Sequence, residues 1–147
     1  MTLEALYQQI ILDHYRRPRN KRPLKTAAAM VEHENPACGD RIELAVEFEK
    51  NGKIREVFFN GEGCAVSTAS ASMMTQFAKG KSLDDLKRWV DLFIDIMCGG
   101  ESVEKLEEFG ELAALKGVVN YPIRVKCATL AWHALREAIS HPAQKEH

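Results

Sequence analysis

Four residues carry most of the chemistry that this sequence offers: Cys38, Asp40, Cys64 and Cys127. Cys38 and Asp40 are separated only by Gly39, whose backbone freedom allows both side chains to turn toward one point. Three thiolates and a carboxylate form a four-ligand set that suits tetrahedral Zn²⁺, and thiolates also select iron–sulfur clusters. Because a carboxylate is a harder and more exchangeable ligand than a thiolate, such a site would be less closed than one with four cysteines.

The wide spacing of the cysteines leaves other chemistries open. No Cys-x-x-Cys pair is present, so the fold must assemble any site. Cysteines in a chain without an export signal stay reduced, which favours metal binding or thiol chemistry over disulfides. From spacing alone the alternatives are a metal site, a thiol-based enzyme, and cysteines that serve only in packing. Cys98 lies apart from the other three, at the end of a predicted helix, and we assign it no catalytic role.

Two of the cysteines fall at predicted helix starts. Cys64 precedes a helix predicted over 65–79, and Cys127 begins one predicted over 127–140. A helix N-terminus offers unpaired N–H groups and the positive end of the helix dipole. Both favour the thiolate, which is the form that attacks electrophiles and binds metals.

The middle of the chain has the pattern of an antiparallel sheet. Apolar and charged residues alternate over 41–49, which predicts a half-buried strand. Asn51-Gly52 is a strong hairpin signal, and the partner strand is expected over about 53–60. A shorter strand at 29–33 would make the sheet about three-stranded.

Helical patterns surround this sheet. One apolar stripe runs along residues 3–15, and further helices are expected over 65–79, 83–97 and 127–140. The glutamate-rich stretch 101–111 reads as a solvated acidic turn or a short helix. The sequence therefore predicts an α+β fold, with helices packed on one face of a small antiparallel sheet.

The length, net charge and apolar pattern of the chain limit the classes of protein to which it can belong. The chain has 147 residues, which fits a single domain spanning 1–147, with a frayed tail from about 141. Its net charge of −1 argues against a nucleic-acid partner. No run of 18 apolar residues is present to span a membrane, and the N-terminus lacks a signal-peptide pattern. We therefore expect a cytoplasmic protein.

The histidines are weaker candidates for chemistry. His14 falls on the apolar face of the first helix, which is typical of a structural histidine. His33 and His133 would suit a Cys/His hydrolase, but nothing in the sequence places either beside a cysteine. Ser67, in the predicted helix over 65–79, reads as a helix-packing residue.

The sequence resembles the IscU/SufU family of iron–sulfur cluster assembly proteins, which is related to the NifU N-terminal domain. It has three cysteine motifs in the same order as that family, each with similar flanking residues. The motifs are Asn35–Asp40, Gly61–Ala65 and Arg124–Trp132, and the likeness extends over nearly the whole chain. Two features resemble the SufU branch. Lys126 stands where IscU-type scaffolds have a histidine, and the acidic segment near 99–117 looks like the SufU insertion.

The resemblance implies that Cys38, Asp40, Cys64 and Cys127 are metal ligands. It also implies an α+β fold and zinc-dependent sulfur transfer. A pyridoxal-phosphate cysteine desulfurase would pass persulfide sulfur to Cys38, with Arg124 in a supporting role, and downstream cluster assembly or acceptor proteins would receive it.

The family offers a second interpretation. The same ligands would suit a scaffold that binds iron and a nascent iron–sulfur cluster for transfer to apo-proteins. A purely structural zinc is a third interpretation, but Asp40 argues against it, because closed structural sites mostly use Cys and His.

Overall fold

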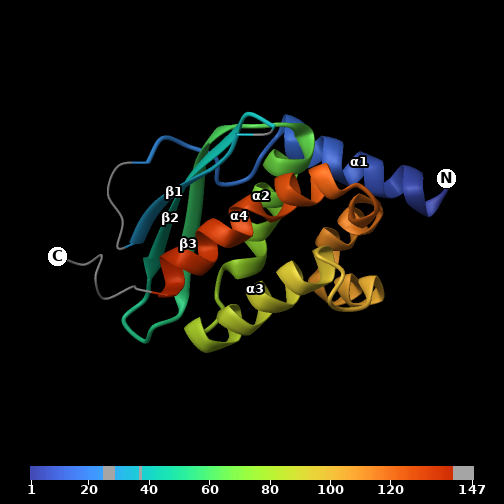
Figure 1. The fold of residues 1–147 in the computed structure, drawn as a ribbon. Coiled ribbons are helices and arrows are strands. Elements are labelled where there is room, and N and C mark those ends of the chain that lie inside the picture. The colour runs from blue at the N-terminus through green and yellow to red at the C-terminus, as the bar shows by residue number, and fades with distance from the viewer. Residues whose placement is uncertain (25–28, 37, 141–147) are drawn as a thin grey trace.

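The computed structural model describes residues 1–24, 29–36 and 38–140, so the expected frayed tail from 141 lies outside the described residues. Within these ranges an antiparallel sheet of order β1-β2-β3 carries the helices on one side (Figure 1), which confirms the predicted α+β class. None of the described helices is long and apolar enough to cross a membrane. The elements are α1 (Leu3–Arg16), β1 (Ala29–Asn35), β2 (Asp40–Phe48), β3 (Ile54–Glu62), α2 (Ala65–Ala78), α3 (Leu83–Met97), the 3₁₀-helical η1 (Val103–Asn120) and α4 (Pro122–Ser140).

The sheet follows the alternating pattern of its central strand. On β2, Ile42, Leu44 and Val46 are buried in the core beneath the helices. The turn into β3 contains Gly52 at φ +87°, a backbone conformation that glycine adopts without strain. The predicted strands are confirmed, and each of the outer two extends two residues further at its C-terminal end than the sequence pattern indicated.

Helices α2 and α4 approach each other closely through a small side chain. The fully buried Ser70 on α2 donates a hydrogen bond to the backbone oxygen of Ala128 on α4 at 2.6 Å. Trp132 donates its indole N–H to the same hydroxyl at 3.1 Å and stacks on Phe93 with ring centroids 4.0 Å apart. This contact fixes α4 against both α2 and α3.

The first helix is held by a buried polar network. The ring of His14 is 1% exposed; Nδ1 lies 2.7 Å from the Ser72 hydroxyl and Nε2 lies 3.2 Å from the Glu111 carboxylate. The same hydroxyl accepts the backbone N–H of Arg19 at 2.8 Å. These bonds join α1 to α2 and η1, and they support the structural interpretation of His14.

The start of α4 was predicted wrongly. The helix begins at Pro122 rather than at residue 127. Proline is favoured at the first helical position because its φ is preset and its missing N–H has no helical partner to lose. The apolar periodicity becomes clear only after residue 127, so the prediction placed the helix start too late.

The acidic segment also differs from expectation. Its glutamates are exposed, as predicted, but the helical segment η1 continues to Asn120 and is interrupted only by non-helical Gly110. The predicted stretch 101–111 is mostly helical, as one of its two alternatives had it, but Leu106 and Phe109 within it are buried. The segment extends beyond Glu111 because the alanine- and leucine-rich residues that follow turn inward. The buried residues of η1 are Leu106, Phe109, Leu112, Ala113, Ala114, Leu115 and Val118.

Replacement of Leu115 by alanine tests whether η1 is part of the core. The Leu115 side chain is fully buried, so Leu115→Ala should lower the free energy of unfolding by about 2–5 kcal/mol. Glu108→Ala, at an exposed position of the same segment, should change it by no more than about 0.5 kcal/mol. Urea denaturation of both variants checks this. Equal, small effects would show that η1 is only a surface appendage.

Candidate metal centre

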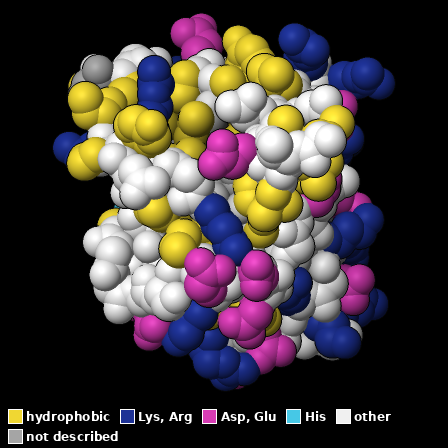
Figure 2. Space-filling model, turned by 90° about the vertical axis from the view of Figure 1, so that its right-hand side faces the viewer, with side chains coloured by type: hydrophobic (Ala, Val, Ile, Leu, Met, Phe, Trp, Pro, Cys, Tyr) yellow, Lys and Arg dark blue, Asp and Glu magenta, His cyan; other side chains and the backbone are white. Residues whose placement is uncertain are grey.

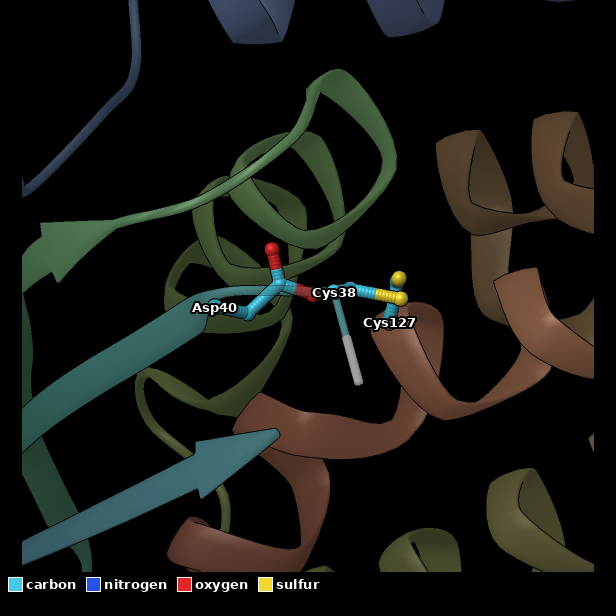
Figure 3. Close-up of side chains that lie close together, drawn as sticks. All are labelled: Cys38, Asp40 and Cys127. Carbon is cyan, nitrogen blue, oxygen red and sulfur yellow. The ribbon is translucent and has the colours of Figure 1, made fainter. Parts of the chain in front are cut away.

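Cys38, Asp40 and Cys127 come together at one end of the sheet. Their ligand atoms all lie within 4.8 Å of one another. Figure 3 shows the three side chains converging from the β1–β2 connection, the start of β2 and the helix α4. Three of the four predicted ligand residues are therefore adjacent in the fold, although Cys127 is far from the other two in sequence.

A tight turn sets the positions of Cys38 and Asp40. The backbone N–H of Cys38 donates to the carbonyl of Asn35 at 3.1 Å, and Gly39 has φ +72°. Asn35 and Asp40 then pair as the last residue of β1 and the first of β2. The backbone freedom expected of Gly39 is thus used to reverse the chain between the two candidate ligands.

The carboxylate of Asp40 is held on one side only. Asp40 is 2% exposed, and its Oδ1 accepts the backbone N–H of Cys64 at 3.0 Å and the Ser67 hydroxyl at 3.3 Å. Its Oδ2 is buried and has no hydrogen-bond partner among the residues that the structure describes. An unpaired buried carboxylate oxygen is costly unless a cation satisfies it. The donor set of thiols plus this oxygen therefore fits a bound Zn²⁺ or iron ion.

Cys64 occupies the helix start predicted for it. It is the N-cap residue of α2, and its sulfur accepts the N–H of Ser67 at 3.5 Å and lies 3.7 Å from the Ser67 hydroxyl. Its thiol is not part of the gathered group of Cys38, Asp40 and Cys127. The structure thus places the Cys64 backbone against Asp40 while its side chain caps the helix.

Cys127 lies in the second turn of α4 rather than at its start, so the expected effect of a helix N-terminus on this thiol does not apply. The residue is fully buried, and its sulfur lies 3.7 Å from the carbonyl oxygen of Ile123 and 3.9 Å from the Asn35 amide nitrogen. Burial, reinforced by contacts with Asp40 and Cys38, raises the pKa of the Cys127 thiol far above its ordinary value. A metal ion bound here must therefore displace a proton.

Arg124 lies one turn before Cys127 on the exposed side of α4. Its contact with Cys127, followed by the charges of Cys64 and Cys38, raises the pKa of its guanidinium. Arg124 therefore places a positive charge beside the thiols.

Sequence reasoning missed the residues that orient the ligands. Ser67 reads as a helix-packing residue, yet its hydroxyl holds Asp40. Asn35 places its amide against the sulfur of Cys127. The available signal was local: Ser67 is three residues after Cys64, which is the spacing of a side chain that can interact with a helix cap.

A groove opens beside this centre. It has a volume of about 460 Å³ and lies between α1, η1 and the start of α4, with Tyr7, Val66, Tyr121 and Arg124 among its lining residues. Figure 2 shows hydrophobic side chains gathered on the upper part of the adjoining face and charged side chains below them. The exposed large hydrophobic residues of α1 and the α4 start are Leu3, Leu6, Leu12, Tyr15, Tyr121 and Ile123.

The fold and the site agree with one family of proteins. Residues 6–128 match the NifU-like N terminal domain, and the chain belongs to that family. It is 43% identical to the zinc-dependent sulfurtransferase SufU of Bacillus subtilis, over 94% of this chain and 92% of that protein. It is 42% identical to the iron–sulfur cluster assembly scaffold protein IscU of Streptococcus pyogenes, over 99% and 89%.

A solved structure gives the same picture of the fold. The putative iron–sulfur cluster assembly scaffold protein for the SUF system from Fervidobacterium islandicum superposes with a TM-score of 0.75 at 29% identity, over 94% of this chain and 99% of that one. The predicted membership of the IscU/SufU family is thereby confirmed.

Gly63 should be required for metal binding. A Cβ at this position would lie 2.2 Å from the Ser67 hydroxyl and 3.0 Å from Asp40 Oδ1. Gly63→Ala should therefore displace the support of Asp40 and lower zinc affinity by roughly 10–100-fold, the range for disturbed support of a ligand. Competition with a chelator measures this.

Gly117→Ala is the matched control, because a Cβ there meets no atom within 4 Å. It should leave zinc affinity unchanged. Equal zinc affinity in the Gly63 variant and the parent chain would contradict the role assigned to the Ser67–Asp40 contact.

Proposed function

We propose that this chain acts in iron–sulfur cluster assembly as a zinc-dependent acceptor of persulfide sulfur. Cys38, Asp40, Cys64 and Cys127 bind the zinc ion, with the Cys64 side chain turning from its helix cap to complete the set. The sulfur comes from a pyridoxal-phosphate cysteine desulfurase, and cluster assembly or acceptor proteins receive it next. All four cysteines are free thiols, which accords with a reducing, cytoplasmic site of action.

The observation that carries this proposal is the buried Asp40 oxygen that, within the described part of the chain, has no partner and lies in a cluster of thiols. The charge of a buried carboxylate is costly unless a cation compensates it. Zn²⁺ would supply the compensating charge and keep the thiols deprotonated at neutral pH.

Accessibility assigns different roles to the two gathered cysteines. Cys127 is fully buried, whereas Cys38 is partly exposed on a turn. Cys38 is therefore the thiol that an incoming persulfide can reach, and Cys127 is the anchoring ligand. Arg124, over the thiols, is a supporting residue that can neutralise the anionic persulfide as it approaches.

The sulfur transfer itself needs no change of oxidation state overall. The Cys38 thiolate attacks the terminal sulfur of the donor persulfide. A new sulfur–sulfur bond forms on Cys38 as the donor's bond breaks. The donor cysteine leaves as a thiolate and takes up any proton that the persulfide carried. This exchange follows the rules of thiol–disulfide chemistry.

The groove and the apolar face beside the centre support a protein donor. Tyr121 and Arg124 both line the groove, and the exposed side chain of Ile123 lies between them in sequence, four residues before Cys127. Exposed hydrophobic groups next to a reactive site are typical of a protein–protein contact surface. We assign this surface to the desulfurase, whose persulfide must come within bonding distance of Cys38.

A scaffold for a nascent cluster is the second candidate. The same thiols and carboxylate suit iron, and the S. pyogenes relative that carries the scaffold name matches 99% of this chain. Lys126, in place of a histidine next to Cys127, and the acidic insertion, which forms η1, favour the acceptor.

Alanine production by a partner cysteine desulfurase tests the proposal. With iron excluded and a reductant present, the zinc form of this protein should stimulate alanine production strongly. Cys38→Ala should abolish the stimulation because the acceptor thiol is lost. Cys98→Ala is the matched control, since Cys98 is exposed and outside the site; it should stimulate like the parent chain. Absence of stimulation by the parent chain would sink the acceptor role and favour the scaffold.

A further inference from the structure

A polar seam runs between the edge strand β1 and the helix α4, outside the centre described above. It borders an open, shallow hollow of about 410 Å³ whose lining includes His33, Asn35, Lys126 and His133. Asn35, at one end of this seam, contacts the sulfur of Cys127. His33 and His133, which the sequence analysis could not place beside a cysteine, therefore line the same hollow.

The strand pattern explains why His33 faces α4. Val31 and Asn35, two residues to either side, are both buried, and alternate residues of a strand point to the same face. Across the seam, His33 Nε2 lies 2.6 Å from Glu137 Oε2. His133 is four residues before Glu137 on the same helix, so the two side chains lie on one helical face.

Two imidazoles and a carboxylate form a ligand set that binds Zn²⁺ and other borderline divalent cations. A site with three such protein ligands leaves a position for water and exchanges its ion readily. A histidine and a glutamate four residues apart on a helix, with a third ligand from a facing strand, can surround one ion. An ion pair between exposed side chains contributes little stability by itself. A contribution to the stability of the fold therefore does not explain why these three side chains lie together.

We propose that His33, His133 and Glu137 form a second, exchangeable divalent-cation site. The ligand atoms of these three residues are not gathered as tightly as those of Cys38 and its neighbours, so ion binding draws the half-buried His133 ring toward the His33–Glu137 pair. Lys126 lies seven residues from His133, roughly 10 Å along the helix axis, and does not compete for the site.

The position of this site gives the second ion a defined place in the molecule. His133 follows Cys127 by six residues on α4, and His33 precedes Cys38 by five. The second ion thus lies near the cysteine centre but shares no ligand with it. The inference does not depend on sulfur transfer, because the site is defined by its own ligands.

Titration with zinc tests the second site. The reduced protein is first loaded with one equivalent of Zn²⁺ and then titrated with more, followed by calorimetry and by NMR of the histidine rings. A second equivalent should bind and shift the ring signals of His33 and His133. The ring of His14, buried and bonded at both nitrogens, should not shift.

Two double variants complete the test. In H33N/H133N the second equivalent should bind at least about tenfold more weakly, because loss of a direct ligand costs at least as much as loss of its support. The first equivalent should bind as before, which verifies that the variant is folded. H141N/H147N removes the two histidines nearest the C-terminus and should bind both equivalents like the parent chain.

The opposite outcomes would overturn the proposal. These are the absence of a second equivalent, equal binding of it by H33N/H133N, or its loss in H141N/H147N. A failure of the first equivalent to bind would instead contradict the cysteine centre, so the two failures are distinguishable.

Discussion

The orientation of one carboxylate determines the candidate metal centre. The backbone N–H of Cys64 and the hydroxyl of Ser67 both bond to Oδ1 of Asp40, whereas Oδ2 is buried with no partner in residues 1–24, 29–36 and 38–140. The cost of an unpaired buried oxygen must be offset elsewhere. A cation beside the thiols of Cys38 and Cys127 would offset it, and its binding energy would also stabilise the fold.

The rest of the fold brings the parts of this centre together. The β1–β2 turn carries Cys38 and the start of β2 carries Asp40, while α2 supplies the two donors to Asp40 and α4 supplies Cys127. The hydrogen bonds of Ser70 with α4 keep these two helices in register. A shift of either helix would separate Asp40 from its donors or from Cys127, so packing in the core controls the geometry of the site.

Much of this arrangement was predictable, because it depends on local patterns. The alternation in the central strand and the turn at Gly39 follow from rules that act over a few residues. The start of α4 was missed because Pro122, its N-terminal signal, precedes the apolar stripe. The role of Ser67 could not be predicted, since it depends on Asp40 approaching from a different element. The Cys64 side chain, which the structure uses as a helix cap, shows the same limit: sequence patterns identify candidate ligands, but tertiary packing decides where their side chains point.

X-ray absorption spectroscopy at the zinc edge is the most direct test of the central claim, which is that three thiolates and Asp40 hold one ion. For the parent chain with one equivalent of Zn²⁺, we expect three sulfur ligands at about 2.3 Å and one oxygen ligand at about 2.0 Å. In Cys64→Ala the sulfur number should fall to two. Two sulfur ligands in the parent chain, unchanged in Cys64→Ala, would show that Cys64 remains a helix cap and would contradict the four-ligand centre.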